Sequence, residues 1–161
     1  MTSDRFLAER LTRRYTQTID APPERVFALL CPVREAEWLD GWRYTMIRSE
    51  SGLAEAGAVF TTPGSGEPDT VWIITRHEPA SRLVEFVRFT HQSRVCVLRI
   101  VVRPRDPAGS FVDVAYTYTA TSPAGNAFIG RHTENAFLEA VTFWERSMNH
   151  WLATGERLSK A

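Results

Sequence analysis

The stretch Ile19-Asp20-Ala21-Pro22-Pro23-Glu24-Arg25-Val26-Phe27 marks the change from a strand to a helix. Residues 13–20 alternate in the period-two pattern of a β-strand, and the two prolines end that pattern. A proline fits the first turn of a helix, where its missing N–H has no partner to lose. The apolar spacing of residues 26–30 then predicts a helix, and residues 32–39 predict a second short helix.

Strand-like segments separated by turns continue from there to residue 121. They are predicted, from their β-branched and aromatic residues and the turns between them, at residues 44–50, 58–62, 70–77, 83–90, 95–103 and 111–121. Together with the strand before Asp20, these segments make seven strands.

A long helix is predicted from Ser122-Pro123 to about Leu152. Serine is a favoured N-cap and proline a favoured first residue, while Gly155 suits the C-terminal cap. A helix of about 30 residues is about 45 Å long, and a small domain can cover it only with a curved sheet. The patterns predict an α+β fold, with two short helices after strand 1 and seven strands curved around the C-terminal helix.

The length of 161 residues is near the usual size of one domain. We expect residues 13–154 to form that single domain and residues 155–161 to be a C-terminal tail. Residues 1–12 have two open interpretations, a short amphipathic helix or a disordered segment.

The composition argues against several classes of function. Lys+Arg 19 balance Asp+Glu 19, so no overall field attracts nucleic acid, and we expect no nucleic-acid partner. No window approaches the roughly 18 apolar residues of a membrane span, and no signal sequence is recognised, which predicts a cytoplasmic protein without stable membrane insertion. Cys31 and Cys96 match neither a disulfide framework nor a metal spacing. The histidines share no ligand spacing, so we expect neither a metal nor another cofactor.

The sequence resembles the START-like, birch-pollen-allergen-type superfamily (SRPBCC), also called the polyketide cyclase/dehydrase and lipid-transport group. The resemblance covers roughly residues 13–154, and its most specific parts are the Asp20–Phe27 string, Trp38 to Trp42, Val71-Trp72-Ile73-Ile74, Glu78-Pro79 to Leu83 and the helix entered from Ser122-Pro123. It implies a helix-grip fold, in which an antiparallel seven-stranded sheet grips the long helix with an apolar cavity between them. It also implies binding of hydrophobic small molecules, with enzymes a minority.

Strand parity predicts which side chains face such a cavity. If Gln92-Ser93 is a two-residue turn, one face of the hairpin is apolar except for Glu85, and the opposite face carries Arg88, Arg99 and Arg103 toward solvent. A three-residue turn would turn one strand over, and Glu85 would then face water next to Arg99.

Three polar side chains are candidates for catalysis, namely Glu85, Tyr116 and Tyr118. A carboxylate on an apolar face must be hydrogen-bonded or have a raised pKa, which would make Glu85 a polar anchor or a general acid/base. The two tyrosine hydroxyls could orient a ligand carbonyl or hydroxyl. The alternative for the tyrosines is aromatic packing against the long helix with locally bonded hydroxyls.

The predicted ligand-binding residues are mostly large apolar side chains of the inner face and the long helix. They are Trp38, Trp42, Phe60, Val87, Phe89, Leu98, Ile100, Tyr116, Tyr118, Phe137 and Trp144. Trp38 and Trp42 are also candidates for a gate at the cavity entrance, with a plug of the barrel end as the alternative.

Three classes of function are compatible with these features. The first is a binding module, a monomer or homodimer that holds a hydrophobic small molecule (a lipid, a polyketide or a quinone-like compound). The second is an aromatase/cyclase- or dehydratase-type enzyme, in which Glu85 with Tyr116 or Tyr118 moves protons. The third is a protein-interaction domain of the chaperone-activator type, which predicts an exposed apolar patch and a filled interior.

Overall fold

The structure is a computed structural model that describes residues 5–160. Its strands are β1 (Arg10–Ile19), β2 (Thr45–Arg48), β3 (Val59–Thr62), β4 (Thr70–Glu78), β5 (Leu83–Thr90), β6 (Arg94–Arg105) and β7 (Gly109–Ala120). Its helices are α1 (Pro23–Leu29), α2 (Pro32–Trp38), α3 (Pro123–Arg131) and α4 (Glu134–Thr154). The order of these elements confirms the predicted α+β arrangement.

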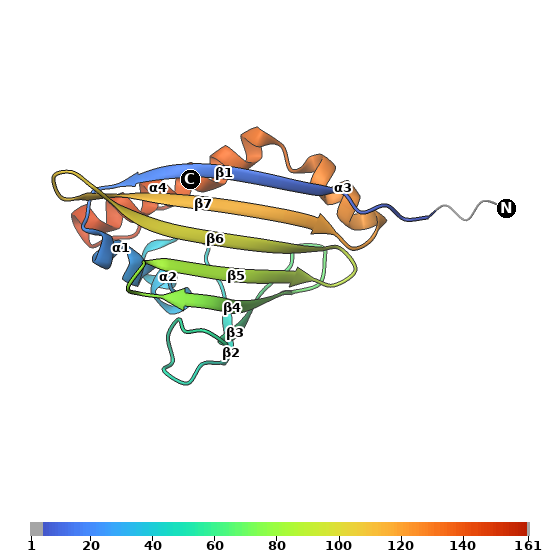
Figure 1. The fold of residues 1–161 in the computed structure, drawn as a ribbon, viewed down its shortest axis with the longest axis horizontal. Helices are drawn as coiled ribbons and strands as arrows, with labels where there is room; N and C mark the ends of the chain where they lie inside the picture. Colours follow the sequence, from blue (N-terminus) through green and yellow to red (C-terminus); the bar gives the residue numbers. More distant parts are fainter. Residues whose placement is uncertain (1–4, 161) are drawn as a thin grey trace.

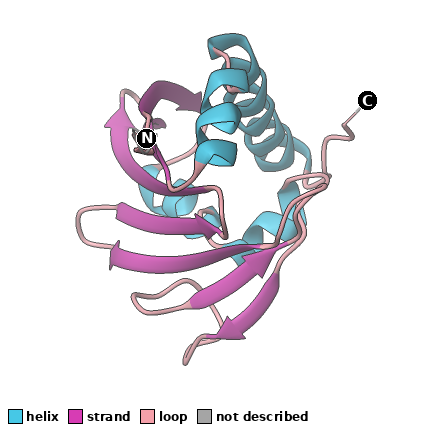
Figure 2. Cartoon of the chain, turned by 90° about the vertical axis from the view of Figure 1, so that its right-hand side faces the viewer, coloured by secondary structure: helices cyan, strands magenta, loops and turns pink. Residues whose placement is uncertain are grey.

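The seven strands form one antiparallel sheet in the order β1-β7-β6-β5-β4-β3-β2. Because β1 and β2 are the two edges, α1 and α2 connect opposite sides of the sheet. Figure 1 views the sheet from its outer side with the helices behind it, and Figure 2 shows the strands curving around the helices. The predicted helix-grip fold is confirmed.

Polar side chains attach α4 to the edge strand β1. Gln17 is fully buried, and its amide donates a hydrogen bond of 3.0 Å to the carbonyl of Val141. The Thr18 N–H donates to the Glu145 carboxylate at 2.6 Å, and the Asn149 amide donates to the Thr18 carbonyl at 2.9 Å. These bonds satisfy backbone groups of an edge strand and hold the helix over the concave face of the sheet.

The C-terminal helical region is broken at His132-Thr133, which corrects the prediction of one continuous helix. Thr133 is the N-cap of α4, because its hydroxyl accepts a backbone N–H of the first turn at 3.1 Å. The His132 ring packs against Tyr118 with 4.8 Å between ring centroids. The predicted ends are confirmed, with Ser122 as N-cap of α3 and Gly155 ending α4 at a φ of 74°.

The hairpin between β5 and β6 has a three-residue turn, so the predicted two-residue register is wrong. Thr90 pairs with Arg94, and Arg88 pairs with Cys96. Gln92 adopts a left-handed conformation with a φ of 56°, as tight hairpin turns require at one position. The shift by one residue turns β5 over relative to the prediction, whereas β6 and β7 keep their predicted inner faces.

The start of α3 holds this turn in place. The Ser122 hydroxyl donates to the Gln92 carbonyl at 2.5 Å, and the Thr121 N–H donates to the Ser93 carbonyl at 2.7 Å. Gly125 lies so close to Ser93 that a Cβ atom at this position would overlap the carbonyl oxygen. The register of the hairpin is therefore supported by residues about 30 positions further along the chain.

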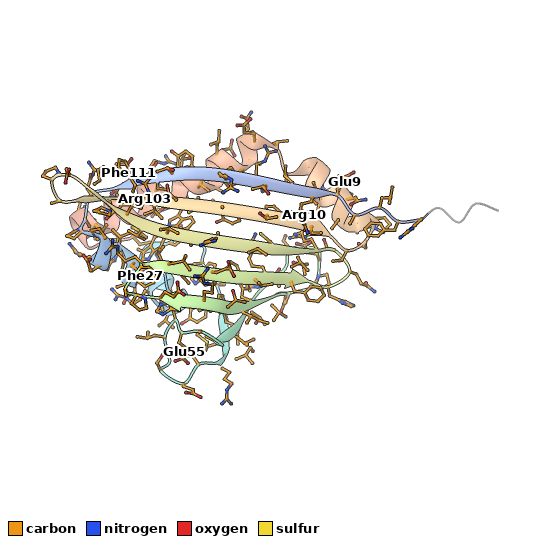
Figure 3. All side chains as sticks on the ribbon, viewed as in Figure 1. Glu9, Arg10, Phe27, Glu55, Arg103 and Phe111 are labelled. Atoms are coloured by element: carbon orange, nitrogen blue, oxygen red, sulfur yellow. The ribbon has the colours of Figure 1, made fainter. Side chains whose placement is uncertain are left out.

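The outer face of the sheet carries exposed arginines, as predicted for Arg99 and Arg103. Arg103 forms an ion pair with Asp113 at 2.5 Å and lies 5.1 Å from the centre of the Phe111 ring. Figure 3 labels Arg103 and Phe111 near the turn that joins β6 and β7. The third predicted outer residue, Arg88, lies on the inner face instead, because β5 is turned over.

Both terminal segments are attached to the fold. Residues 5–9 are not helical, and the Asn126 side chain accepts from the Glu9 N–H and donates to the Leu7 carbonyl, each at 2.9 Å. Residues 1–4, the remainder of the segment expected to be helical or disordered, lie outside the described residues. At the other end, the Lys160 N–H donates to the Asp40 carboxylate at 2.8 Å, which brings the end of the chain to the loop after α2.

Candidate functional site

A cavity of about 380 Å³ lies between the concave face of the sheet and α4. Its inner walls are formed by Glu35, Trp38, Phe60, Trp72, Phe86, Arg88, Leu98, Ile100, Tyr116, Tyr118, His132, Phe137, Val141 and Trp144. Exposed residues, among them Gly41, Ala140 and Lys160, lie at its mouth. The cavity is therefore open to solvent, and its walls are mostly aromatic and aliphatic.

Four aromatic rings make one wall of the cavity. Phe60 stacks on Trp72 with 5.2 Å between centroids, and Phe86 meets Trp72 edge-on at 5.7 Å. Trp42 also meets Trp72 edge-on at 5.8 Å, and its indole N–H donates to the Pro32 carbonyl at 2.9 Å. Rings fixed by such contacts form a rigid apolar surface, which suits the flat face of a ring-containing ligand.

Arg88 brings a permanent positive charge into the cavity from β5. Its Nη2 donates to the Tyr118 hydroxyl at 3.1 Å. The guanidinium carbon lies 4.9 Å from the ring centre of Trp72 and 5.3 Å from that of Tyr116, within the range of cation–π attraction. Protein atoms surround the guanidinium, and Arg88 lines both the cavity and a smaller pocket of about 50 Å³ beside Thr90 and Cys96.

His132 enters the cavity wall because the helical region is broken at this residue. Its ring stacks on Phe128 at 5.6 Å between centroids, in addition to its contact with Tyr118. Burial first, and then the positive charges of Arg13, Arg88 and Arg94, lower the pKa of His132. The imidazole is therefore neutral at neutral pH. Its buried Nε2 has no hydrogen-bond partner among residues 5–160.

Glu35 places a carboxyl group in the wall that α2 contributes. Burial raises the pKa of Glu35 to about 8, so the group is mainly a neutral carboxylic acid at pH 7. Within the described part of the chain, no hydrogen bond or ion pair to the Glu35 carboxyl is formed. Burial is the main cause of the raised pKa of Tyr116, and Glu35 makes a smaller contribution in the same direction than Tyr118 and Cys96 do. A neutral acid in an apolar cavity can donate a hydrogen bond or a proton to a ligand oxygen.

Most of the predicted ligand-binding residues lie together in this cavity. Those that line it are Trp38, Trp42, Phe60, Leu98, Ile100, Tyr116, Tyr118, Phe137 and Trp144. Of the two gate candidates, Trp38 is fully buried and donates to the Leu29 carbonyl at 3.2 Å, whereas half-buried Trp42 follows Gly41 at the mouth. The gate itself stays a prediction.

Glu85, Val87 and Phe89 lie on the outer face of the sheet, which corrects their predicted place in the cavity. The physical reason is the three-residue turn, since it reverses the two faces of β5. Glu85 stands opposite Arg99 in the register and accepts a hydrogen bond of 2.9 Å from the Thr75 hydroxyl. The candidate acid of the sequence is therefore outside the cavity.

Three polar residues of the inner wall, Arg88, Glu35 and His132, were not among the predicted site residues. Arg88 follows from the true register, but alternation alone favours the other face of β5, which carries Leu83, Val87 and Phe89, whereas only Val84 and Phe86 are apolar on the face of Arg88. Glu35 had a usable signal, because it precedes Trp38 by three positions and Leu39 by four, which places all three on one face of a helix.

Residues 5–160 contain no group of three or more His, Cys, Asp or Glu side chains that could hold a metal ion. No helix in this range is both long and apolar enough to cross a membrane.

The curved antiparallel sheet that encloses a cavity against a C-terminal helix defines the helix-grip class of fold. The family model described as "Polyketide cyclase / dehydrase and lipid transport" matches residues 10–143. The chain belongs to this family, within the START-like, birch-pollen-allergen-type superfamily, whose fold holds hydrophobic ligands. A comparison with curated proteins gives no match.

Several solved structures share the fold. A point mutant of norcoclaurine synthase from Thalictrum flavum, in complex with a transition state analogue, matches with a TM-score of 0.69 and 10% identity over 92% of this chain and 98% of that one. Ara h 8.0201 matches with a TM-score of 0.65 and 12% identity over 91% and 99% of the two chains. An uncharacterized protein from Rhizobium leguminosarum has a TM-score of 0.63 and 12% identity over 91% and 97%. Identities this low establish the common fold and no shared activity.

Proposed function

We propose that the chain binds a hydrophobic small molecule in the cavity between the sheet and α4. The observation that carries this proposal is an open cavity of about 380 Å³ with rigid aromatic walls and a few polar groups. Ligand pockets usually range from about 300 to 1,000 Å³. A cavity near the lower limit favours a compact ring system, such as a short polyketide or a quinone-like compound, over a diacyl lipid.

The open cavity also favours ligand binding over the alternative function, that of a protein-interaction domain. That alternative predicts a filled interior and an exposed apolar patch. The outer face does expose Ile73, Phe89 and Val97, each by 36% to 41%. The interior is not filled, however. The interaction function therefore accounts only for the exposed apolar residues of the outer face, whereas ligand binding accounts for the cavity and its lining.

Blocking the mouth tests the proposal. N-phenyl-1-naphthylamine is a neutral aromatic dye whose fluorescence rises in apolar surroundings, and it serves as the probe. Ala140→Trp puts a large ring at the mouth, and we expect it to weaken dye binding by about tenfold or more. The matched control is Glu139→Trp, because Glu139 is exposed on the same helix but does not line the cavity. Equal binding by the wild type and Ala140→Trp would show that the dye is not in the cavity.

Native mass spectrometry of protein purified from its own host addresses the natural ligand. A reproducible extra mass that disappears on denaturation would support the proposal, and fragmentation of the released compound would give its chemical class. If the wild type neither retains a compound nor binds the dye, the proposal is wrong.

Glu35 favours a second candidate function, an acid/base enzyme. A general acid works best when its pKa is close to the working pH, and the pKa of Glu35 is about 8. Because Glu85 lies outside the cavity, Glu35 takes over as the candidate acid, with Tyr116 nearby. By donating to a ligand carbonyl, the acid would promote enolisation, in which a water molecule that enters through the open mouth would accept the proton from the carbon next to the carbonyl; cyclases and dehydratases depend on this type of proton transfer.

Hydrogen exchange of 2-acetonaphthone in D₂O tests this second function. If the chain is an acid/base enzyme, it should speed exchange of the methyl protons next to the carbonyl, as followed by proton NMR. Glu35→Gln should remove the acceleration, whereas the control Glu37→Gln should keep it, since Glu37 is exposed and pairs with Arg34. If the wild type binds the ketone without speeding exchange, the enzyme function is wrong and only the binding function remains.

A further inference from the structure

The guanidinium of Arg88 is an enclosed positive charge without a counter-ion in the described chain. No Asp or Glu oxygen of residues 5–160 lies within 4.0 Å of its nitrogens. Glu67, which does not line the cavity, is already bound by Arg94 through two contacts of 2.9 Å. Removing a charge from water costs several kcal/mol unless the charge is paired.

The groups around Arg88 do not neutralise it. Burial raises the pKa of both Tyr116 and Tyr118, so their phenols stay protonated. His132 is neutral, as shown by its lowered pKa, and the Cys96 thiol stands beside the guanidinium. The faces of Trp72 and Tyr116 attract the cation but carry no net charge. The positive charge of Arg88 can therefore pair with an anionic group of a molecule that enters the cavity.

The contacts of Arg88 hold its guanidinium in one orientation and leave some of its N–H groups free to donate hydrogen bonds. The guanidinium contacts the Cys96 thiol, and its Nη2 donates to the Tyr118 hydroxyl, which leaves its other N–H groups free. Because that hydroxyl oxygen accepts the bond, the phenol keeps its own proton to donate. A guanidinium held between aromatic rings loses little further freedom when it binds. An oxygen-bearing group beside Arg88 can thus receive hydrogen bonds from the guanidinium and from the phenol.

We propose that Arg88 and Tyr118 form an anion-binding subsite in the cavity, and that the ligand is a hydrophobic acid whose carboxylate binds there. The proposal rests on the function proposed above. A planar carboxylate matches the two parallel N–H donors of an arginine, while the ring or chain of the acid lies against Trp72, Phe60 and Phe86. The apolar wall supplies the contact area, and the subsite selects acids from neutral compounds of the same shape.

Matched acid and amide pairs test the subsite. The probes are 2-naphthoate with 2-naphthamide and decanoate with decanamide, titrated at pH 7 by isothermal calorimetry. The wild type should bind each acid about tenfold or more tightly than its amide, since a charge-assisted hydrogen bond is roughly twice as strong as a neutral one. Arg88→Met should remove this preference by weakening the acids alone, and Tyr118→Phe should reduce it.

The control for surface charge is Arg99→Met, because Arg99 is exposed on the outer face of the adjacent strand. This variant should keep the preference for acids. Arg88→Gln is the second variant at the site, in case Arg88→Met does not fold, as judged by circular dichroism. The ratio of acid to amide affinity is the critical readout, because a purely structural role of Arg88 would weaken both probes equally.

The outcomes separate the two proposals. If the wild type binds acids and amides with equal affinity, the cavity binds ligands but the anion subsite is wrong. The subsite is also wrong if both Arg88 variants keep the wild-type ratio. If no probe of either pair binds, the subsite is wrong, and the ligand-binding function is wrong as well if the wild type also neither binds N-phenyl-1-naphthylamine nor retains a compound.

Discussion

Arg88 on β5 donates a hydrogen bond of 3.1 Å to Tyr118 on β7, across the intervening strand β6. Both residues pair in register with the same residue, Cys96, so the three side chains form one row across the concave face. Arg88 and Tyr118 line the cavity, and the Tyr118 ring packs against His132 at the break between α3 and α4. The arrangement places a charge where a stable interior would have an apolar side chain, which has a measurable consequence for stability.

Replacing Arg88 by methionine should stabilise the ligand-free protein. The variant removes an enclosed unpaired charge, and exchange of buried charges for apolar groups of similar volume commonly gains about 1–4 kcal/mol. The lost cation–π and hydrogen-bond contacts offset part of that gain, so we expect an increase of about 1 kcal/mol in the free energy of unfolding. Urea denaturation at pH 7 measures it. A loss of more than about 1 kcal/mol would identify Arg88 as a stabilising core residue.

The contribution of Glu35 to the stability of the protein should fall as the pH rises from about 4.5 to about 8. Its pKa is raised by burial from 4.5 to about 8 in the folded state. Between these values the unfolded chain has lost the proton and the folded chain still holds it, so the unfolded state gains relative stability with pH. The slope is at most about 1.4 kcal/mol per pH unit, and it ends above the folded pKa.

Glu35→Gln isolates this contribution from those of other groups. The amide has the same shape and no proton to lose, so thermal unfolding of the variant should lack the fall in stability that Glu35 causes and should keep only the opposite contribution of groups such as His132, whose pKa is lowered. At pH 9 the variant should be more stable than the wild type, whereas at pH 4 the two should be similar. Parallel curves for the two proteins across pH 4.5–8 would mean that Glu35 ionises normally.

The sequence predicted the fold well because its strongest signals are local. The change of period at Ile19–Phe27, the capping serine at Ser122 and the glycine at Gly155 each act within a few residues. Parity also placed β6 and β7 correctly, since one face of each strand is continuously apolar. Leu98 and Tyr116 therefore line the cavity as expected.

The errors in the predicted fold lie where contacts with residues distant in the sequence determine the local structure. Glu85, Val87 and Phe89 were misplaced because the register depends on a turn held by the start of α3. The break at His132 depends on the packing of its ring against Tyr118 from another element. Neither contact leaves a periodic signal in its own segment, and both errors removed polar residues from the predicted cavity.

Trp144 should report ligand binding directly. Its side chain lines the cavity, and its buried Nε1 has no hydrogen-bond partner in the structure described for residues 5–160. A ligand oxygen can accept that N–H, so Trp144→Phe should weaken 2-naphthoate binding by about threefold to tenfold. It should also reduce the ligand-induced change in tryptophan fluorescence.

The control is Trp151→Phe, because Trp151 lies further along the same helix and packs on the core without lining the cavity. This variant should bind 2-naphthoate with wild-type affinity and keep the ligand-induced fluorescence change. If the two variants behaved alike in both measurements, Trp144 would not be in contact with the ligand.

Gly125→Ala should disturb the contact that supports the register of β5. A Cβ atom at this position would overlap the Ser93 carbonyl oxygen, which belongs to the backbone and cannot rotate away. The helix and the hairpin must then separate, at a cost of about 1–3 kcal/mol, as for other overpacked sites.

Gly130→Ala is the matched control, because nothing lies within 4 Å of a Cβ atom at this position of the same helix. Alanine has the higher helix propensity, so the control should gain up to about 1 kcal/mol. Denaturation of both variants measures the difference, and amide exchange at Gln92 and Ser93 should be faster in Gly125→Ala alone. Equal stabilities would show that the start of α3 does not hold the hairpin, and Arg88 would then owe its place in the cavity to the turn itself.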